Sequence, residues 1–319
     1  MHIGFSREQR EFAKVALANA SYNPRVLALI YTGVSVGIAF LFTAISYLIQ
    51  QQIDTTGGLG GMGMRAILST LQSVLPMISA IFVPFWDAGY VKASILHARH
   101  ETATPQTLLT GLRRFGPVLR LLLLRMVCLF IIMFVSAQAS SILFSMTPWA
   151  APVQEMSETI LAAGAITDEL IAQMLPTLLP LYGLFFLIFL GISIPFFYCL
   201  RMADYALMDK PVGALGAMIL SFRMMRGNLL RLLKLDLSFW WFYVIGICSV
   251  VIGYLDMILP YLGISLPISA DAAFFLFYIL HILCELILAW CAVSYVKTTY
   301  ACAYDTFLPQ EQNPTIIDV

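Results

Sequence analysis

Six long apolar runs, separated by shorter polar segments, organise the chain. They cover residues 26–49, 67–91, 118–142, 175–200, 237–260 and 272–296. Each run is long enough to cross a bilayer, which takes about 20 residues in a helix. None alternates apolar and polar residues as barrel strands do. Backbone groups in lipid must bond within their own segment, so the pattern predicts an all-α integral membrane protein with six transmembrane helices.

The basic residues indicate how these helices are oriented. Of the 18 basic residues, all except Arg65 lie on the side of the termini or at span ends facing that side. The opposite loops carry acidic residues, among them Asp54, Glu155 and Asp271. Basic loops stay in the cytoplasm. We therefore expect a single membrane domain over 1–319 in the cytoplasmic membrane, with both termini inside, an exported loop at 143–174 and a cytoplasmic tail at 297–319.

Short amphipathic segments precede several of the runs, at approximately 6–20, 104–115 and 211–226. Helices of this kind lie at a membrane surface, with their arginines at the headgroup level. A shift of 111 residues also places 84–124 on 195–235 with 11 identical positions, including LRLL at 119–122 and 230–233. We interpret this as an internal repeat of helical hairpins, each led by an interfacial helix, and a third copy at the N-terminus remains an alternative.

Composition supports a membrane protein and limits the kinds of partner that we expect for it. The chain is 60% hydrophobic and 11% charged, whereas soluble domains carry roughly 25% charged residues. The formal net charge of zero gives no reason to expect a nucleic acid. All six cysteines fall in predicted spans or on the cytoplasmic side, which favours packing over disulfides. We expect no cofactor and no metal.

The second half of the chain resembles a known family. Three segments carry the resemblance: SFRMMRGNLLRLLKLDLSFWWFYVIG (221–246), LPYLG (259–263) and AAFFLFYIL (272–280). The matching residues are Ser221, Met225, Arg226, Gly227, Leu237, Ser238, Phe239, Trp241, Pro260, Tyr261, Phe277 and Tyr278. Together with REFAKVALANASYNPRVLALI (10–30), they are similar to the bacterial membrane family known as domain of unknown function 975. The resemblance implies a multi-pass membrane fold and no established activity.

Glu285 is the most informative polar residue within the runs. It lies at the middle of the sixth span, where a charged side chain costs about 3 kcal/mol on insertion. His281 lies four residues earlier and shares its helix face. The two residues form either a proton- or cation-handling site in a cavity or a neutral hydrogen-bonding group that fixes helix packing.

Arg125 and Asp236 form a second candidate. They occupy equivalent positions in the repeat, so we expect similar depths near the cytoplasmic face and an ion pair that Asp87 joins. The alternative is that Arg125 extends independently to the lipid headgroups. His97 and His100 flank Arg99 near the same level, which indicates a solvated polar edge rather than a metal site.

Motifs of familiar enzymes are absent from the sequence: it contains no HExxH, no Walker-type GxxxxGK and no GxSxG. Two functions remain. One is a non-enzymatic membrane scaffold or envelope factor acting through the lipid bilayer and through protein partners or further copies of itself. The other is a transporter-like carrier with a polar site around Glu285 and His281. We favour the scaffold because a cavity for a polar solute needs several convergent polar groups, and few polar residues lie in the spans.

Overall fold

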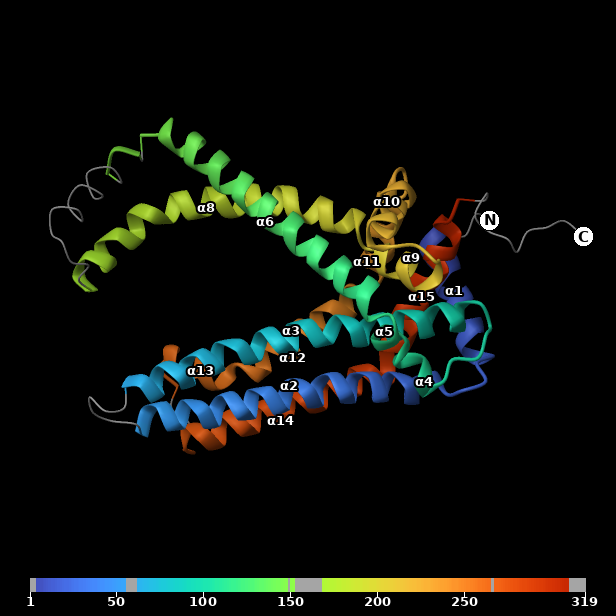
Figure 1. Ribbon diagram of the computed structural model, residues 1–319, viewed down its shortest axis with the longest axis horizontal. Helices are drawn as coiled ribbons and strands as arrows, with labels where there is room; N and C mark the ends of the chain where they lie inside the picture. The colour runs from blue at the N-terminus through green and yellow to red at the C-terminus, as the bar shows by residue number, and fades with distance from the viewer. Residues whose placement is uncertain (1–3, 56–61, 149, 153–167, 265–266, 310–319) are drawn as a thin grey trace, which may run out of the picture. The chain divides into compact units, whose positions relative to one another are not determined.

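The computed structural model describes residues 4–55, 62–148, 150–152, 168–264 and 267–309. Within these ranges the chain is helical and no strand is present, which confirms the all-α prediction. The chain divides into two compact units, and the single membrane domain expected over 1–319 stays a prediction. Unit 1 comprises residues 1–119 and 202–319, and unit 2 comprises residues 120–201. Figure 1 shows the helices of both units.

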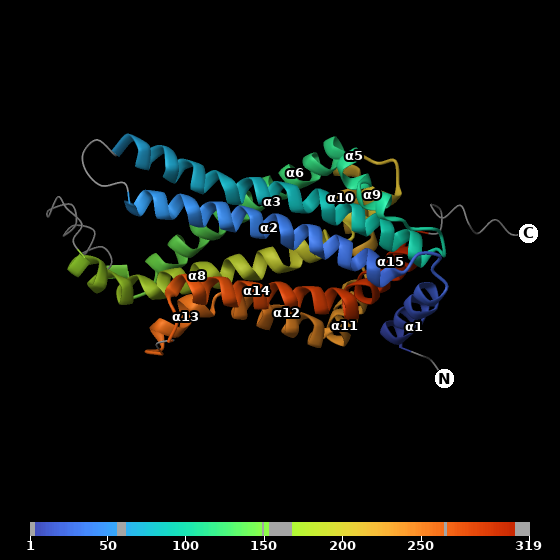
Figure 2. The same ribbon diagram turned by 90° about the horizontal axis from the view of Figure 1, so that it is seen from below.

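Unit 1 contains most of the helices. In chain order they are α1 (Phe5–Ala18), α2 (Pro24–Thr55), α3 (Met62–Ala98), α4 (Pro105–Leu108), α5 (Thr110–Arg113), α9 (Ala203–Asp209), α10 (Ala214–Met225), α11 (Leu229–Ser238), α12 (Trp240–Gly253), α13 (Leu255–Tyr261), α14 (Ala270–Leu288), the π-helical turn η2 (Ala289–Val293) and α15 (Ser294–Phe307). Helix α2 packs on α3 and on α14, and α14 packs on α12 (Figure 2). The predicted amphipathic segments correspond to α1, to α4 with α5, and to α10.

Two glycines allow α3 to lie directly against the α4–α5 segment. A Cβ atom on Gly89 would lie 1.8 Å from the Leu108 carbonyl oxygen, and one on Gly111 would lie 1.8 Å from the Phe85 carbonyl oxygen. Both contacts are with backbone, which cannot rotate away as a side chain can. The aromatic rings of Phe85 and Phe115 stack beside this crossing, with centroids 4.5 Å apart. This close contact fixes the position of the α4–α5 segment, which follows α3 in the chain, against α3.

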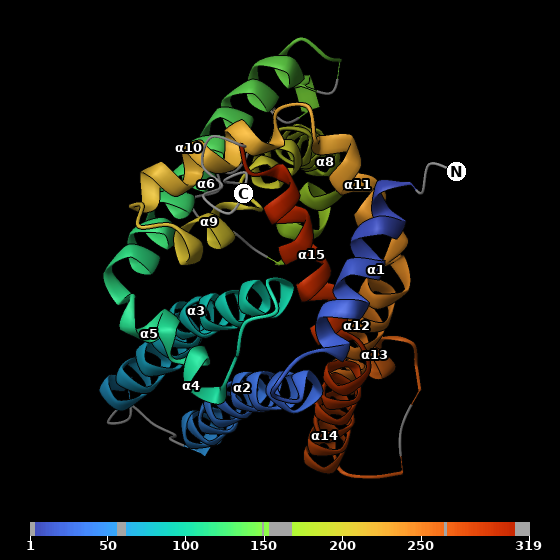
Figure 3. The same cartoon turned by 90° about the vertical axis from the view of Figure 1, so that its right-hand side faces the viewer.

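Helices α14 and α15 form a continuous rod through η2, because helical backbone runs without a break from Ala270 to Phe307. The predicted sixth span ended at residue 296, with a cytoplasmic tail from 297. The helix continues beyond residue 296, because α15 extends to Phe307 and is buried along most of its length, with Ala301 and Tyr304 fully covered. Figure 3 shows α15 beside α1 at this end of unit 1. Residues 310–319 of the predicted tail lie outside the described residues.

The turn between α10 and α11 explains part of the family resemblance. Gly227 has a φ of +90°, a left-handed conformation that side chains with a Cβ rarely adopt. Just before it, Ser221 and Met225 are fully buried, and Phe239 after α11 is 1% exposed. Among the residues that match the family, Gly227 therefore forms the turn. Ser221, Met225 and Phe239 pack on either side of it.

Unit 2 consists of most of α6 (Phe115–Ser145) and of α8 (Asp168–Cys199). Large apolar side chains lie open along both helices: Phe130 is 64% exposed, Phe134 66% and Leu187 69%. An apolar surface of this extent suits a lipid environment. Residues 153–167, within the predicted exported loop at 143–174, lie outside the described residues.

Among the described residues, four helical segments are long and apolar enough to cross a membrane: Pro24–Ile53, Phe115–Ser145, Leu178–Asp209 and Asp271–Phe307. A fifth would combine α11 and α12, which are bent by 63°. The protein is therefore a membrane protein with four to five candidate spans, compared with the six predicted. The second predicted run, 67–91, lies within α3.

Candidate functional site: polar contacts along α15

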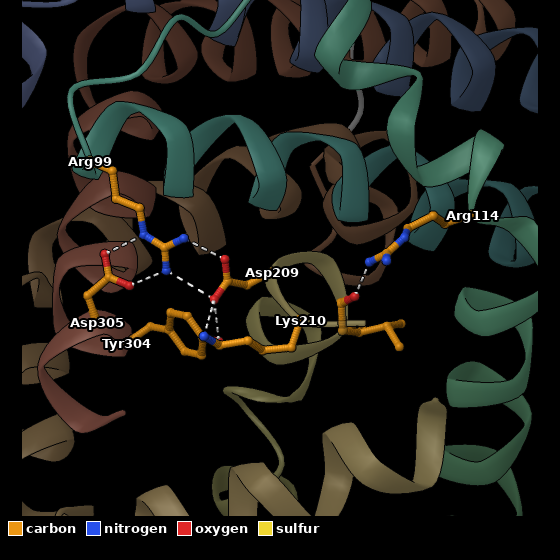
Figure 4. A network of polar contacts seen from close by, with 7 residues as sticks. Arg99, Arg114, Asp209, Lys210, Tyr304 and Asp305 are labelled. Carbon is orange, nitrogen blue, oxygen red and sulfur yellow. Dashed lines mark hydrogen bonds and ion pairs between the residues drawn. The ribbon is translucent and has the colours of Figure 1, made fainter. Parts of the chain in front are cut away.

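Arg99 joins three elements of unit 1 just after α3 ends (Figure 4). Its Nη1 and Nη2 donate to the two carboxylate oxygens of Asp209 on α9, at 2.5 and 3.0 Å. Its Nε and Nη2 donate to the carboxylate of Asp305 on α15, at 3.2 and 2.6 Å. Tyr304 adds a hydrogen bond from its hydroxyl to Asp209, at 3.1 Å. We call Arg99, Asp209, Tyr304 and Asp305 the Arg99 cluster.

The Arg99 cluster is largely withdrawn from solvent. The side chain of Arg99 is 32% exposed and that of Asp209 is 5% exposed. Burial by itself would lower the pKa of Arg99, but the hydrogen bonds and charges of Asp209 and Asp305 outweigh it and hold the pKa above its usual range. All oxygens of both carboxylates accept hydrogen bonds from the guanidinium. Such carboxylates are poorly available as bases, nucleophiles or metal ligands, so the geometry favours a structural role.

A second set of contacts lies about two turns earlier on α15. Lys297 Nζ donates to the carboxylate of Asp87 on α3 at 2.8 Å, and the hydroxyl of Tyr31 on α2 donates to the same oxygen at 2.9 Å. The indole of Trp86 donates to the Tyr31 carbonyl oxygen at 2.9 Å. Asp87 therefore has Lys297 as an ion-pair partner, which the sequence analysis did not propose.

Further polar contacts of α15 reach α2, α11 and α12, among other elements. Ser294 Oγ donates to the Pro24 carbonyl oxygen at 2.6 Å. The Tyr300 hydroxyl donates to the Asp236 carboxylate and lies 2.7 Å from the Tyr243 hydroxyl. Successive turns of α15 thus carry a polar side chain that contacts another helix.

The predicted Arg125–Asp236 pair involves residues of different units. Arg125, in unit 2, donates from Nη2 to the Leu200 carbonyl oxygen at 3.1 Å. Asp236, in unit 1, accepts the hydrogen bond from Tyr300. Each residue has a contact within its own unit, and the ion pair between them stays a prediction.

His281 and Glu285 lie one turn apart on α14, as their spacing predicted. His281 Nδ1 lies 2.9 Å from Ser249 Oγ and 3.0 Å from the Ser249 carbonyl oxygen on α12. A Cβ atom on Gly253 would lie 3.3 Å from the His281 side chain, so the two helices pack closely here. Glu285 is half-buried and has no hydrogen bond or ion pair among the described residues. Two cavities of unit 1, of about 510 and 410 Å³, are lined by neither residue.

The prediction of a solvated edge was wrong for His97. This residue is 4% exposed, and its Nε2 has no hydrogen-bond partner among the described residues. Burial lowers the pKa of His97 to about 4. It lies in the last turn of α3, beyond the predicted span 67–91. The described residues contain no group of three or more side chains able to hold a metal ion.

Sequence reasoning missed the Arg99 cluster. Asp209 and Asp305 were visible as acidic residues on the predicted cytoplasmic side, where Glu8, Glu11, Glu101 and Asp204 also lie. Acidic character alone therefore did not single the two residues out. Nothing in the local sequence assigns them to Arg99, because the partners are 110 and 206 positions apart.

Comparison with known proteins identifies the family of the chain. The searches of curated proteins and of solved structures returned no match. A family model described as "Protein of unknown function (DUF975)" matches residues 5–308. This match covers almost the whole chain, including the segments that carried the resemblance, and the chain belongs to that family.

Proposed function

We propose that this protein is a non-enzymatic scaffold of the cytoplasmic membrane that acts through lipid and protein partners. The observation that carries the proposal is the mutual pairing of polar groups along α15. Arg99 and Lys297 are engaged with Asp209, Asp305 and Asp87 of the same unit. Polar side chains committed in this way hold helices in fixed positions, as a scaffold requires, and leave little free for catalysis.

We further propose six spans with both termini in the cytoplasm. The span to be added to the four to five candidates is the second predicted run, 67–91, which lies within α3. At 1.5 Å per residue, about 20 residues of this run cross the roughly 30 Å of a bilayer core. The placement of the basic residues supports the orientation. Interfacial helices in repeated hairpins would correspond to α4 with α5 and to α10.

Labelling with an impermeant thiol reagent on intact cells tests this topology. Cysteines introduced at positions 58, 155 and 266 should react, and cysteines at positions 107 and 215 should not. Reaction at 107 or 215 would contradict the arrangement.

A carrier is the second candidate, and Glu285 is the observation that favours it. A half-buried carboxylate in a predicted span, without a described partner, is the kind of group that proton-coupled carriers use. The close packing of its neighbour His281 against α12 argues against the carrier, because it leaves little space for a solute beside Glu285.

The variant Glu285→Gln separates the two candidates, because it keeps the shape of the side chain and removes its titration. Growth or flux complementation by this variant should equal that of the wild type if the protein is a scaffold. A variant with an unchanged Tm and lost complementation would establish the carrier. Native mass spectrometry of the purified protein in lipid then identifies the lipids and proteins that remain bound.

A further inference from the structure

A cavity of about 510 Å³ lies where α1, the start of α2 and the junction of η2 with α15 meet. Figure 3 shows α1 lying against α15 at this end of unit 1. Two cations line the cavity, Lys14 and Arg25, together with the aromatic rings of Trp290 and Tyr295. Its volume falls within the range of about 300–1,000 Å³ that is usual for ligand sites. The cavity shares no residue with the Arg99 cluster.

The two cations of the cavity differ in how their charge is balanced within the described residues. Lys14 pairs with Glu11 at 2.9 Å, and both side chains are more than half exposed. Arg25 has no carboxylate partner among the described residues. Its guanidinium lies over the Trp290 ring, 5.7 Å from the centroid, so the aromatic face orients the cation and leaves its N–H donors available. An oriented guanidinium without a carboxylate is suited to a bidentate anion.

The local backbone explains how Trp290 and Arg25 come together. The π-helical turn Ala289–Val293 inserts an extra residue between α14 and α15, and such turns frequently accompany functional sites. Ser294 follows directly and binds the Pro24 carbonyl oxygen at 2.6 Å. This bond ties the turn to the first residue of α2, next to Arg25.

We infer that this cavity binds a phosphate ester anion, with Arg25 as its principal ligand and Lys14 as a second cation. The residues lie directly before the first span, 26–49, at the depth where phospholipid headgroups are expected. Leu17 and Trp290 supply an apolar wall for the carbon atoms next to the phosphate. The phosphate belongs either to an anionic phospholipid or to a soluble phosphate ester.

The test uses the full chain, purified in detergent and analysed by native mass spectrometry with phosphatidylglycerol or phosphatidylcholine. The wild type should retain phosphatidylglycerol preferentially. Arg25→Gln should weaken this retention roughly tenfold, because a hydrogen bond to a charged group is lost. The matched control is Arg231→Gln, which removes an exposed arginine of α11 outside the cavity. Equal retention by Arg25→Gln and wild type, or equal losses in both variants, would overturn the inference.

A second measurement needs no substitution. Cys291 lines the cavity and is exposed, whereas Cys248 is exposed on α12 and lies outside it. Site-resolved maleimide labelling should show that phosphatidylglycerol slows the reaction of Cys291 relative to that of Cys248, and that phosphatidylcholine does not. An unchanged ratio of the two rates would contradict occupation of the cavity.

The same labelling identifies the source of the phosphate. If millimolar glycerol 3-phosphate, added without lipid, slows the labelling of Cys291 relative to that of Cys248, the site accepts soluble phosphate esters, and if it does not, the ligand is the lipid. The inference rests on the proposed membrane position of α2 but not on the scaffold role. Topology labelling tests the position separately, so failure of lipid binding at Arg25 leaves the proposed function standing.

Discussion

Helices α14 and α15 form one continuous rod, but they differ in the exposure of their side chains and in the contacts that these side chains make. Along α14, large apolar side chains are open: Leu276 is 55% exposed, Ile279 51% and Ile287 64%. Along α15, Tyr300 is 4% exposed and Tyr304 is fully buried, and both donate hydrogen bonds to carboxylates of other elements. One helix thus passes from an apolar environment into a polar protein interior.

This difference indicates where the fold is specified. Lipid tails are as apolar as the side chains of α14, so burying those side chains against other helices gains little. The α15 half instead holds charged and hydroxyl groups that are stable only with their partners. We therefore expect polar substitutions to cost more free energy of unfolding around α15 than along α14.

The largest effect is expected at Arg99. Arg99→Ala would leave the carboxylates of Asp209 and Asp305 without their cation, and breaking a buried ion pair from one side costs about 3–5 kcal/mol. Equilibrium unfolding in detergent measures the loss. The control Arg231→Ala removes an exposed arginine whose hydrogen-bond partner is Asn228 and should change stability by less than about 0.5 kcal/mol. Similar losses in the two variants would show that the Arg99 cluster stabilises nothing.

The next effect is a dependence on pH that His97 causes. In the folded protein the pKa of His97 is about 4, against about 6.5 in the unfolded chain. The unfolded chain therefore binds the proton first, and stability falls as the pH decreases from about 6.5 to about 4. This pKa difference corresponds to at most about 3 kcal/mol. His97→Gln should flatten the decline in Tm over this interval, whereas His100→Gln should leave it unchanged. Parallel Tm curves for His97→Gln and the wild type would contradict the account.

Apolar periodicity predicted the helices well because helix formation in lipid is a local requirement. The amphipathic segments are helical, five of the six predicted runs lie along long helices, and His281 shares its helix with Glu285. The run 237–260 is instead divided among α11, α12 and α13. The polar contacts of α15 were not predictable in this way. Lys297, Tyr300 and Asp305 have the composition of a solvated tail, and only packing against distant segments buries them. His97 was misjudged for the same reason, since its polar neighbours in sequence did not reveal the helices that cover it.

A smaller effect is expected for the Lys297–Asp87 pair, whose side chains are 30% and 34% exposed. Lys297→Met leaves Asp87 with the hydrogen bond from Tyr31 and should cost about 1–2 kcal/mol. Asp87→Asn should cost a similar amount. The double variant should lose less than the sum of the single losses, because the interaction is removed only once. Additive losses in the double-mutant cycle would show that the two residues do not stabilise each other.

The smallest single loss is expected for Ser249→Ala on α12, which we compare with Tyr300→Phe on α15. Ser249→Ala removes the hydroxyl that contacts His281 on α14 and keeps the Ser249 carbonyl oxygen beside the same ring nitrogen. Hydrogen bonds between transmembrane helices average about 0.6 kcal/mol. Tyr300→Phe removes a hydroxyl that donates to the Asp236 carboxylate, and a hydrogen bond to a charged group contributes about 1.5–3 kcal/mol. Both substitutions preserve the rest of the side chain, so the difference reflects the acceptor and its surroundings. Unfolding in the same detergent should show at least a twofold larger loss for Tyr300→Phe. An equal or larger loss for Ser249→Ala would mean that the α12–α14 contact specifies the fold as strongly as α15 does.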